Sequence, residues 1–201
     1  LWTRELIESA RVQNAPPLVR IVVGVDPAVT NNENSDQTGI VAAGITADGH
    51  YYVLDDKSIY ASPDAWARVA VTLYQDLKAD KIVAETNNGG DMVILLMQQV
   101  DPTVATKKVT ATRGKQLRAE PISSLYEQKR VHHVGYFPEL ETQMCEWTPA
   151  SKDSPDRLDA LVWAISELNA GGSSMLALAS MAVLCSACGM PSPKMASVCF
   201  T

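Results

Sequence analysis

The sequence predicts an α/β domain built on a mixed β-sheet. Two observations carry this prediction. Near the start of the chain, two apolar runs flank the tight-turn dipeptide Asp48-Gly49, which indicates an antiparallel hairpin. After the hairpin, segments with helical spacing alternate with short apolar runs, as in parallel strands joined by helices. A chain of 201 residues is long enough to bury a core in one such domain.

Local signals place the expected elements. Ser62-Pro63 begins a helix, because a capping residue is followed there by proline at the first helical position. The other elements are placed by the spacing of their apolar residues. Strands are expected over residues 18–25, 39–45, 51–54, 82–84, 107–110 and 131–134. Helices are expected over residues 1–14, 62–77, 92–99, 140–145 and 154–168, together with a basic helix that contains Pro121.

Composition divides the chain into three parts. Residues 1–17 are expected to be a linker. Within them, Pro16-Pro17 ends the amphipathic helix expected over residues 1–14. Residues 18–169 contain every expected strand and form the predicted domain. Residues 170–201 are rich in Ala, Ser and Met and nearly uncharged, so we expect a poorly ordered or atypical tail.

The four cysteines do not indicate a disulfide framework, which favours a reducing cytoplasm. Cys185 and Cys188 have the spacing of zinc ligands, but only Cys199 could join them, and no histidine follows. Such a half-site is weak evidence for zinc. No apolar run is long enough to span a bilayer, so no membrane association is expected.

Charge is unevenly distributed. The net charge of −6 taken alone argues against a nucleic-acid partner. The segment 107–130, however, carries seven basic residues and two acidic ones, as expected for a surface that follows a phosphate backbone. A solvated helix face explains a charge cluster about equally well. If the segment does bind DNA, the candidate phosphate contacts are Lys107, Arg113, Lys115 and Arg118.

Three acidic residues stand where a carboxylate is only partly solvated. Asp26 closes the first strand, Glu85 closes the strand over residues 82–84, and Asp159 lies beside the apolar stripe of the last helix. A carboxylate in such a place needs a cation to offset desolvation and mutual repulsion. If the three converge, they form an oxygen-only site for Mg²⁺ or Mn²⁺.

Each acid also has a structural explanation. Asp26 precedes a turn-promoting proline, and Glu85 lies near the start of the next helix. Asp156 belongs to the first turn of the last helix, where an acid complements the helix dipole. Asp159 lies on the same helical face one turn later, among apolar neighbours, and is the hardest to explain structurally. His132 or His133 could serve as a general base, although strand neighbours point to opposite faces.

Six motifs occur in a fixed order along the chain. They are residues 23–28 (VGVDPA), 38–41 (TGIV), 84–90 (AETNNGG), 112–115 (TRGK), 130–135 (RVHHVG) and 154–164 (SPDRLDALVWA). The set resembles the nuclease domain of the large terminase subunit of tailed double-stranded-DNA bacteriophages, and the resemblance covers about residues 1–168. It implies an RNase-H-like fold, with a mixed β-sheet flanked by helices.

The resemblance also implies a function and a site. The function is metal-dependent endonuclease cutting of concatemeric double-stranded viral DNA during genome packaging, in the cytoplasm of the host cell. The metal ligands and catalytic residues would be Asp26, Glu85 and Asp159, with Asp156 as an additional metal ligand. Two Mg²⁺ or Mn²⁺ ions would support in-line hydrolysis of the phosphodiester, with water as the nucleophile.

Partners follow from the same resemblance. They are a packaging ATPase domain, the small terminase subunit and the portal. The sequence lacks the phosphate-binding loop of such an ATPase, because Gly114-Lys115 is followed by Gln116. Residues 1–17 then correspond to the remnant of an inter-domain linker.

Three alternatives remain at this point. A Holliday-junction resolvase is a different nuclease with the same fold, and it would prefer branched DNA. A non-catalytic DNA-binding module of the packaging motor would not need the acidic residues. A sugar-kinase-like or actin-like ATPase also has an early strand that ends in Asp, but it requires glycine-rich phosphate loops that this sequence lacks.

Overall fold

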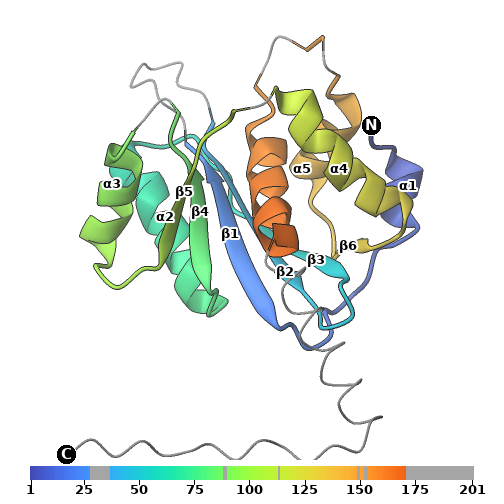
Figure 1. Ribbon diagram of the computed structural model, residues 1–201, viewed down its shortest axis with the longest axis horizontal. Helices are drawn as coiled ribbons and strands as arrows, with labels where there is room; N and C mark the ends of the chain where they lie inside the picture. Colours follow the sequence, from blue (N-terminus) through green and yellow to red (C-terminus); the bar gives the residue numbers. More distant parts are fainter. Residues whose placement is uncertain (28–36, 88–89, 113, 149, 152–153, 171–201) are drawn as a thin grey trace, which may run out of the picture. The chain divides into compact units, whose positions relative to one another are not determined.

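The computed structural model describes residues 1–27, 37–87, 90–112, 114–148, 150–151 and 154–170. Its strands are β1 Arg20–Asp26, β2 Gly39–Ile45, β3 Tyr51–Asp56, β4 Lys81–Glu85, β5 Thr106–Val109 and β6 Val131–His133. They form a mixed six-stranded sheet in the order β5-β4-β1-β2-β3-β6 (Figure 1). Strand β2 pairs antiparallel with both β1 and β3, whereas the other three pairings in the sheet are parallel. The predicted mixed sheet is confirmed.

The hairpin was predicted from its turn, and the structure confirms it. Strands β2 and β3 pair antiparallel from Ile45↔Tyr51 onward. Gly49 in the turn has a φ of +84°, a conformation that glycine adopts without steric cost. The tight turn therefore sets the register between these two strands.

Helices cover both faces of the sheet. They are α1 Arg4–Glu8, α2 Pro63–Asp76, α3 Met92–Val100, α4 Lys115–Glu127 and α5 Pro138–Glu146. A further helix over residues 156–170, called the final helix below, is orange in Figure 1. The final helix, α4 and α5 lie on one face of the sheet, and α2 and α3 lie on the other (Figure 1). Among the described helices, none combines the length and apolar composition needed to cross a membrane.

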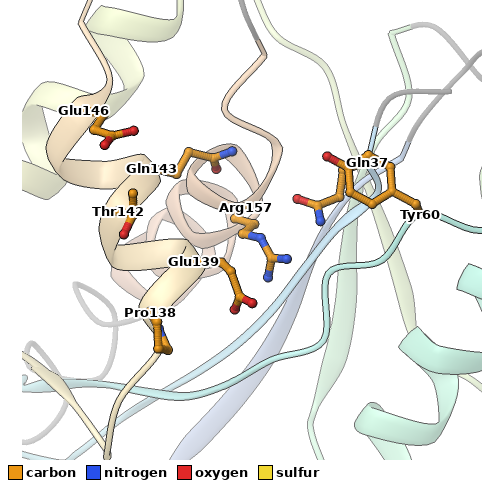
Figure 2. A pocket seen from close by; sticks show the side chains of 8 residues that line it. All are labelled: Gln37, Tyr60, Pro138, Glu139, Thr142, Gln143, Glu146 and Arg157. Carbon is orange, nitrogen blue, oxygen red and sulfur yellow. The ribbon is translucent and has the colours of Figure 1, made fainter. Parts of the chain in front are cut away.

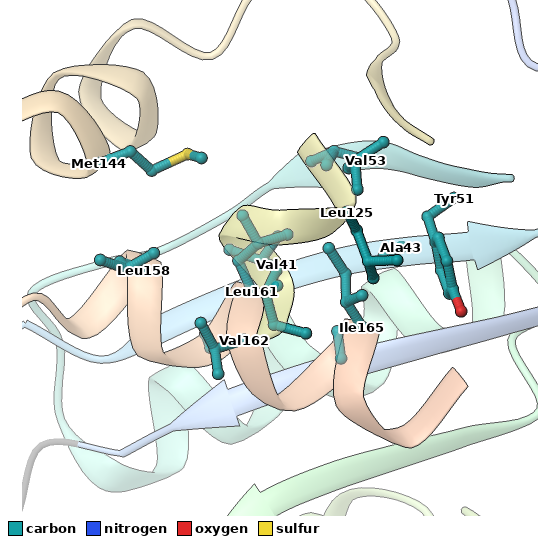
Figure 3. Close-up of a cluster of buried hydrophobic side chains, with 14 of the residues drawn as sticks. Val41, Ala43, Tyr51, Val53, Leu125, Met144, Leu158, Leu161, Val162 and Ile165 are labelled. Atoms are coloured by element: carbon teal, nitrogen blue, oxygen red, sulfur yellow. The ribbon is translucent and has the colours of Figure 1, made fainter. Parts of the chain in front are cut away.

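Side chains along the central strands point alternately to the two faces of the sheet, and they fill one core on each face. On β2, Val41 and Ala43 face the final helix, whereas Ile40 and Ala42 face α2 and α3. Figure 3 shows the first of these cores, with Leu161 of the final helix packed over the sheet. Because both faces are covered, the strands are apolar at nearly every position. A charged residue can therefore reach solvent mainly at the strand ends.

The first helix is shorter than the sequence predicts. The spacing indicated a helix over residues 1–14, but α1 ends at Glu8. Val12 instead forms a parallel bridge beside β6, where its N–H donates to the carbonyl of His133 at 3.0 Å. Pairing at the sheet edge requires extended backbone, so a tertiary contact overrides the helical spacing here.

Residues before Arg20 contribute to the core on the side of the final helix. Trp2 and Ile7 are buried in that core. Arg11 donates hydrogen bonds to the carboxylate of Glu141 at 2.7 and 3.0 Å. Burial raises the pKa of Glu141, but hydrogen bonds from His133 and Arg11 outweigh it and hold the pKa at about 2. The boundary predicted before residue 18 stays a prediction, and residues 171–201 lie outside the described residues.

Candidate metal and nucleic-acid site

Two of the predicted acids leave neighbouring strands at the same end. Strands β1 and β4 are parallel, and their register pairs Val25 with Ala84. Asp26 and Glu85 are the next residue on each strand and the last of each. Strand order and register therefore bring these two residues side by side.

Glycines on the sheet allow the final helix to deliver the other two acids. A Cβ atom at Gly24 would lie 2.0 Å from the carbonyl oxygen of Ala160, and one at Gly39 would lie 1.9 Å from that of Asp156. The helix backbone thus rests directly on β1 and β2. This close approach places Asp156 and Asp159 over the strand ends.

We expect Gly24→Ala to disturb this contact. The added methyl group would meet backbone atoms that can yield only if the final helix shifts, so we expect a loss of about 1–3 kcal/mol in the free energy of unfolding. Urea denaturation measures this loss. Gly44→Ala is the matched control, because a Cβ at this strand glycine would mainly meet the flexible end of Leu18. Equal stability of the two variants would contradict the proposed role of Gly24.

The four acids repel one another. Burial, followed by the negative charges of Asp159, Glu85 and Asp156, raises the pKa of Asp26 well above its usual range. Burial also raises the pKa of Asp159, although the positive charges of Lys115 and Arg118 oppose this rise. Asp156 and Asp159 are both buried, at 8% and 4% exposure. The site therefore concentrates negative charge where water can screen it only poorly.

Glu85 is held by three donors. Trp163 Nε1 donates to Glu85 Oε2 at 2.7 Å, and Arg118 Nη1 donates to the same oxygen at 3.2 Å. Asn87 Nδ2 donates to Glu85 Oε1 at 2.9 Å. The guanidinium carbon of Arg118 lies 4.6 Å from the centre of the Trp163 ring. Since a carboxylate offers about four acceptor positions, most of those on Glu85 are already in use.

Asp159 is paired with two cations from α4. Lys115 Nζ lies 2.6 Å from Asp159 Oδ2, and Arg118 Nη2 lies 3.6 Å from Asp159 Oδ1. Lys115 also donates to Ser154 Oγ at 2.9 Å. Lys115 therefore bridges Asp159 and Ser154, and it already neutralises the buried Asp159 Oδ2.

The acids fit a hard divalent cation by their chemistry. All four offer only carboxylate oxygens, which such cations prefer. A bound cation would also offset the repulsion at Asp26. Within the described part of the chain, no three acidic, histidine or cysteine side chains already lie together as ligands of one ion. Because Lys115 and Arg118 lie against Asp159 and Glu85, metal binding would require both cations to withdraw.

The predicted phosphate contacts point in different directions. Lys115 and Arg118 face the acids, and Lys107 donates to Glu167 of the final helix at 2.6 Å. Arg113 lies outside the described residues. The basic segment is thus largely paired with acids rather than forming one free stripe, and its role in binding DNA stays a prediction.

The two candidate histidines lie far along the sheet from the acids. Both belong to β6, which is separated from β1 by β2 and β3. His132 stacks on Tyr52, and its ring hydrogen-bonds with His50 at 2.8 Å. His133 is buried against Glu141. These contacts give both histidines a structural role and leave neither of them beside Asp26.

The structure also has a polar pocket near the start of the final helix, which the sequence did not indicate. Its volume is about 600 Å³. Figure 2 shows its lining: Gln37, Tyr60, Pro138, Glu139, Thr142, Gln143, Glu146 and Arg157. Arg157 is paired with Asp56 at 2.6 Å, so the carboxylates of Glu139 and Glu146 dominate the charge of the lining. The pocket is therefore unsuited to a phosphate group.

Known proteins share both the sequence pattern and the fold of this chain. The sequence profile of the terminase RNaseH-like domain family matches residues 23–168. No curated protein is detectably similar in sequence. The nuclease domain of the large terminase subunit gp2 of bacterial virus Sf6 is similar in structure, with a TM-score of 0.62 at 10% identity, over 81% of this chain and 96% of that one.

Two further solved structures have the same fold. The large terminase nuclease of thermophilic phage G20c, with bound cobalt, matches with a TM-score of 0.59 at 12% identity, over 73% of this chain and 80% of that one. The large terminase of a second thermophilic bacteriophage matches with a TM-score of 0.58 at 12% identity, over 77% of this chain but only 41% of its own. The profile match spans most of the chain, and the fold agrees with it. The chain belongs to the terminase RNase H-like domain family.

Proposed function

We propose that the chain is a divalent-metal-dependent DNA endonuclease that cuts concatemeric viral DNA during genome packaging. The observation that carries this proposal is the meeting of Asp26, Glu85, Asp156 and Asp159 at one end of the sheet, in a chain of the terminase family. Burial and mutual repulsion make these carboxylates costly there in the absence of cations. They suit the binding of cations beside a phosphodiester.

In this proposal, Asp26, Glu85 and Asp159 hold the metal and are the catalytic residues, and Asp156 is an additional ligand. When bound, two Mg²⁺ or Mn²⁺ ions supply Lewis-acid activation of water and stabilisation of the leaving 3′ oxygen. Trp163 and Asn87 orient the Glu85 carboxylate through their hydrogen bonds. Support for a metal comes from the G20c nuclease, whose structures include magnesium-, cobalt- and zinc-bound forms.

Lys115 and Arg118 have two roles in the same proposal. Without metal they neutralise Asp159 and Glu85. Once a divalent cation takes over that neutralisation, both side chains become available for the phosphate backbone, as predicted from the sequence. Arg113 and Lys107 would add further backbone contacts. Such contacts position DNA without reading its sequence, which suits an enzyme of low sequence preference.

The cellular setting is also proposed. A packaging ATPase domain, the small terminase subunit and the portal are the expected partners, and the host cytoplasm is the expected location. The large terminase of the second thermophilic bacteriophage is more than twice as long as the part that this chain matches. The activities of a whole terminase are therefore proposals for this chain.

Plasmid cleavage tests the proposed activity. Supercoiled plasmid incubated with the folded protein at low salt should become nicked and linear with Mg²⁺ or Mn²⁺, and EDTA should prevent this change. Plasmid that stays supercoiled with both metals would contradict the proposal. A four-way DNA junction added as a competing substrate distinguishes this proposal from the resolvase alternative. A resolvase would cut the junction in preference to linear duplex.

A further inference from the structure

Three basic side chains converge on one buried carboxylate of the final helix. Glu167 Oε1 lies 3.2 Å from Lys81 Nζ and 3.8 Å from Arg20 Nη2. Glu167 Oε2 lies 2.6 Å from Lys107 Nζ. One negative charge therefore faces three positive charges, and the four side chains together carry a net charge of +2. We call Arg20, Lys81 and Lys107 the basic cluster.

The basic cluster lies on the same face of the sheet as the acids. Side chains alternate along a strand, so Lys81, Val83 and Glu85 of β4 point to one face. Strand register adds Lys107, which pairs with Val83 in the parallel ladder. Val83 is buried in the core under the final helix, which identifies the face. On β1, the same alternation puts Arg20 on the side of Asp26.

The basic cluster and the acids are close enough together to contact one short stretch of duplex. Four residues of β4 separate Lys81 from Glu85, which corresponds to about 13 Å at roughly 3.3 Å per residue. Eight residues of the final helix separate Glu167 from Asp159, or about 12 Å at roughly 1.5 Å per residue. Since phosphates follow one another at about 3.4 Å along the duplex axis, the two groups lie about four steps apart.

The two lysines of the basic cluster are accessible although their anchor is not, and Arg20 is less exposed, at 18%. The side chain of Glu167 is 8% exposed, whereas those of Lys81 and Lys107 are 33% and 49% exposed. The carboxylate can thus hold the three stems in place while the ammonium groups still face solvent. This is the arrangement expected for a surface that meets a phosphate, rather than for an ion pair that only supports the fold.

We propose that Arg20, Lys81 and Lys107 form a phosphate-binding site for the DNA backbone, about four steps from the position of cleavage. The inference rests on the proposed nuclease function and deepens it. Glu167 is a positioning residue in this site. It orients the three cations and also limits their net charge, so its removal should have an effect opposite to the loss of a cation.

Salt dependence of DNA binding tests the inference. Binding of a labelled short duplex is measured by fluorescence anisotropy at several salt concentrations, with Ca²⁺ in place of Mg²⁺ to suppress cutting. For Lys81→Met and Lys107→Met, we expect weaker binding and a slope of log K against log salt reduced by about 0.9 per lost contact. Glu167→Gln should instead bind more tightly, because it leaves the cluster with all three charges.

Lys108→Met is the matched control. Lys108 is the next residue on β5, so its side chain points to the opposite face, where it pairs with Asp91. Its replacement should leave affinity and slope unchanged. The thermal unfolding of each variant is measured in parallel, and the lysine variants keep the test decisive if Glu167→Gln proves unstable.

The outcomes separate this inference from the proposed function. If the wild-type protein binds duplex but neither lysine variant changes the slope, the phosphate site is wrong while the nuclease proposal stands. Equal weakening by Lys108→Met would also contradict it, since charge alone would then explain the effect. If the wild-type protein does not bind duplex at all, the proposed function fails first.

Discussion

Asp26→Asn should abolish DNA cleavage and at the same time stabilise the metal-free protein at neutral pH. The loss of activity is expected because Asp26 is proposed to hold the metal, and removing one such electrostatic contact costs at least about 10²-fold in rate. The gain in stability follows from the burial of the Asp26 carboxylate and from the repulsion that it experiences from Asp159, Glu85 and Asp156. A neutral amide of the same shape removes that repulsion.

The sign of the pH dependence follows from the raised pKa of Asp26. A carboxyl whose pKa is raised by folding binds its proton more tightly in the folded than in the unfolded protein. Its contribution to stability is therefore complete below the ordinary value of 3.8 and is lost as the pH rises through the raised pKa. The stability advantage of Asp26→Asn over the wild type should thus appear at neutral pH and shrink as the pH falls.

Urea denaturation in EDTA at several pH values measures this difference, and plasmid cleavage measures the activity. Asp64→Asn is a suitable control, because Asp64 forms an exposed ion pair with Arg68. It should change neither property by much. A variant of Asp26 that cuts DNA at a near-normal rate would remove this residue from the site. A variant that is less stable than the wild type at neutral pH would contradict the electrostatic account.

The second large effect separates the two acids of the final helix. Asp159→Asn should reduce cleavage by at least about 10²-fold more than Asp156→Asn. Asp159 lies one turn deeper, and its buried carboxylate has Lys115 and Arg118 as counter-charges, whose place a divalent cation would take. Asp156 lies in the first helical turn, where the helix dipole already stabilises an acid.

Initial rates of plasmid cleavage, measured with saturating Mn²⁺, compare the two variants. Both replacements remove one negative charge from the same helix, so each is the other's control for charge. If Asp156→Asn is inactive and Asp159→Asn cuts normally, the assignment of the two acids is reversed.

Much of the fold follows from patterns that are local in the sequence. The Asp48-Gly49 turn predicts the hairpin, and Ser62-Pro63 predicts the start of α2. Asp26 and Glu85 were predicted to close two strands, and they are the last residues of β1 and β4. These predictions succeed because each depends on a few adjacent residues and on general rules of chain geometry.

Other features depend on contacts between distant residues. The residues next to Gly24 in the sequence do not show why glycine is required there. The requirement arises from the carbonyl group of Ala160 in the final helix, which leaves no room for a Cβ atom. The length of α1 depends likewise on a bridge between Val12 and Val134. The orientation of Lys115 toward Asp159 could not be predicted either, since helical spacing does not say which neighbour a long side chain meets.

The most direct test of the account is the location of a divalent cation in a crystal of the wild-type protein soaked in Mn²⁺. Anomalous difference density identifies Mn²⁺ independently of activity. The account predicts density within coordination distance of Asp26 and Asp159, with Glu85 beside it and with Lys115 withdrawn from Asp159. Strong density elsewhere in the protein, with none at these carboxylates, would contradict the central claim that the acids form a metal site.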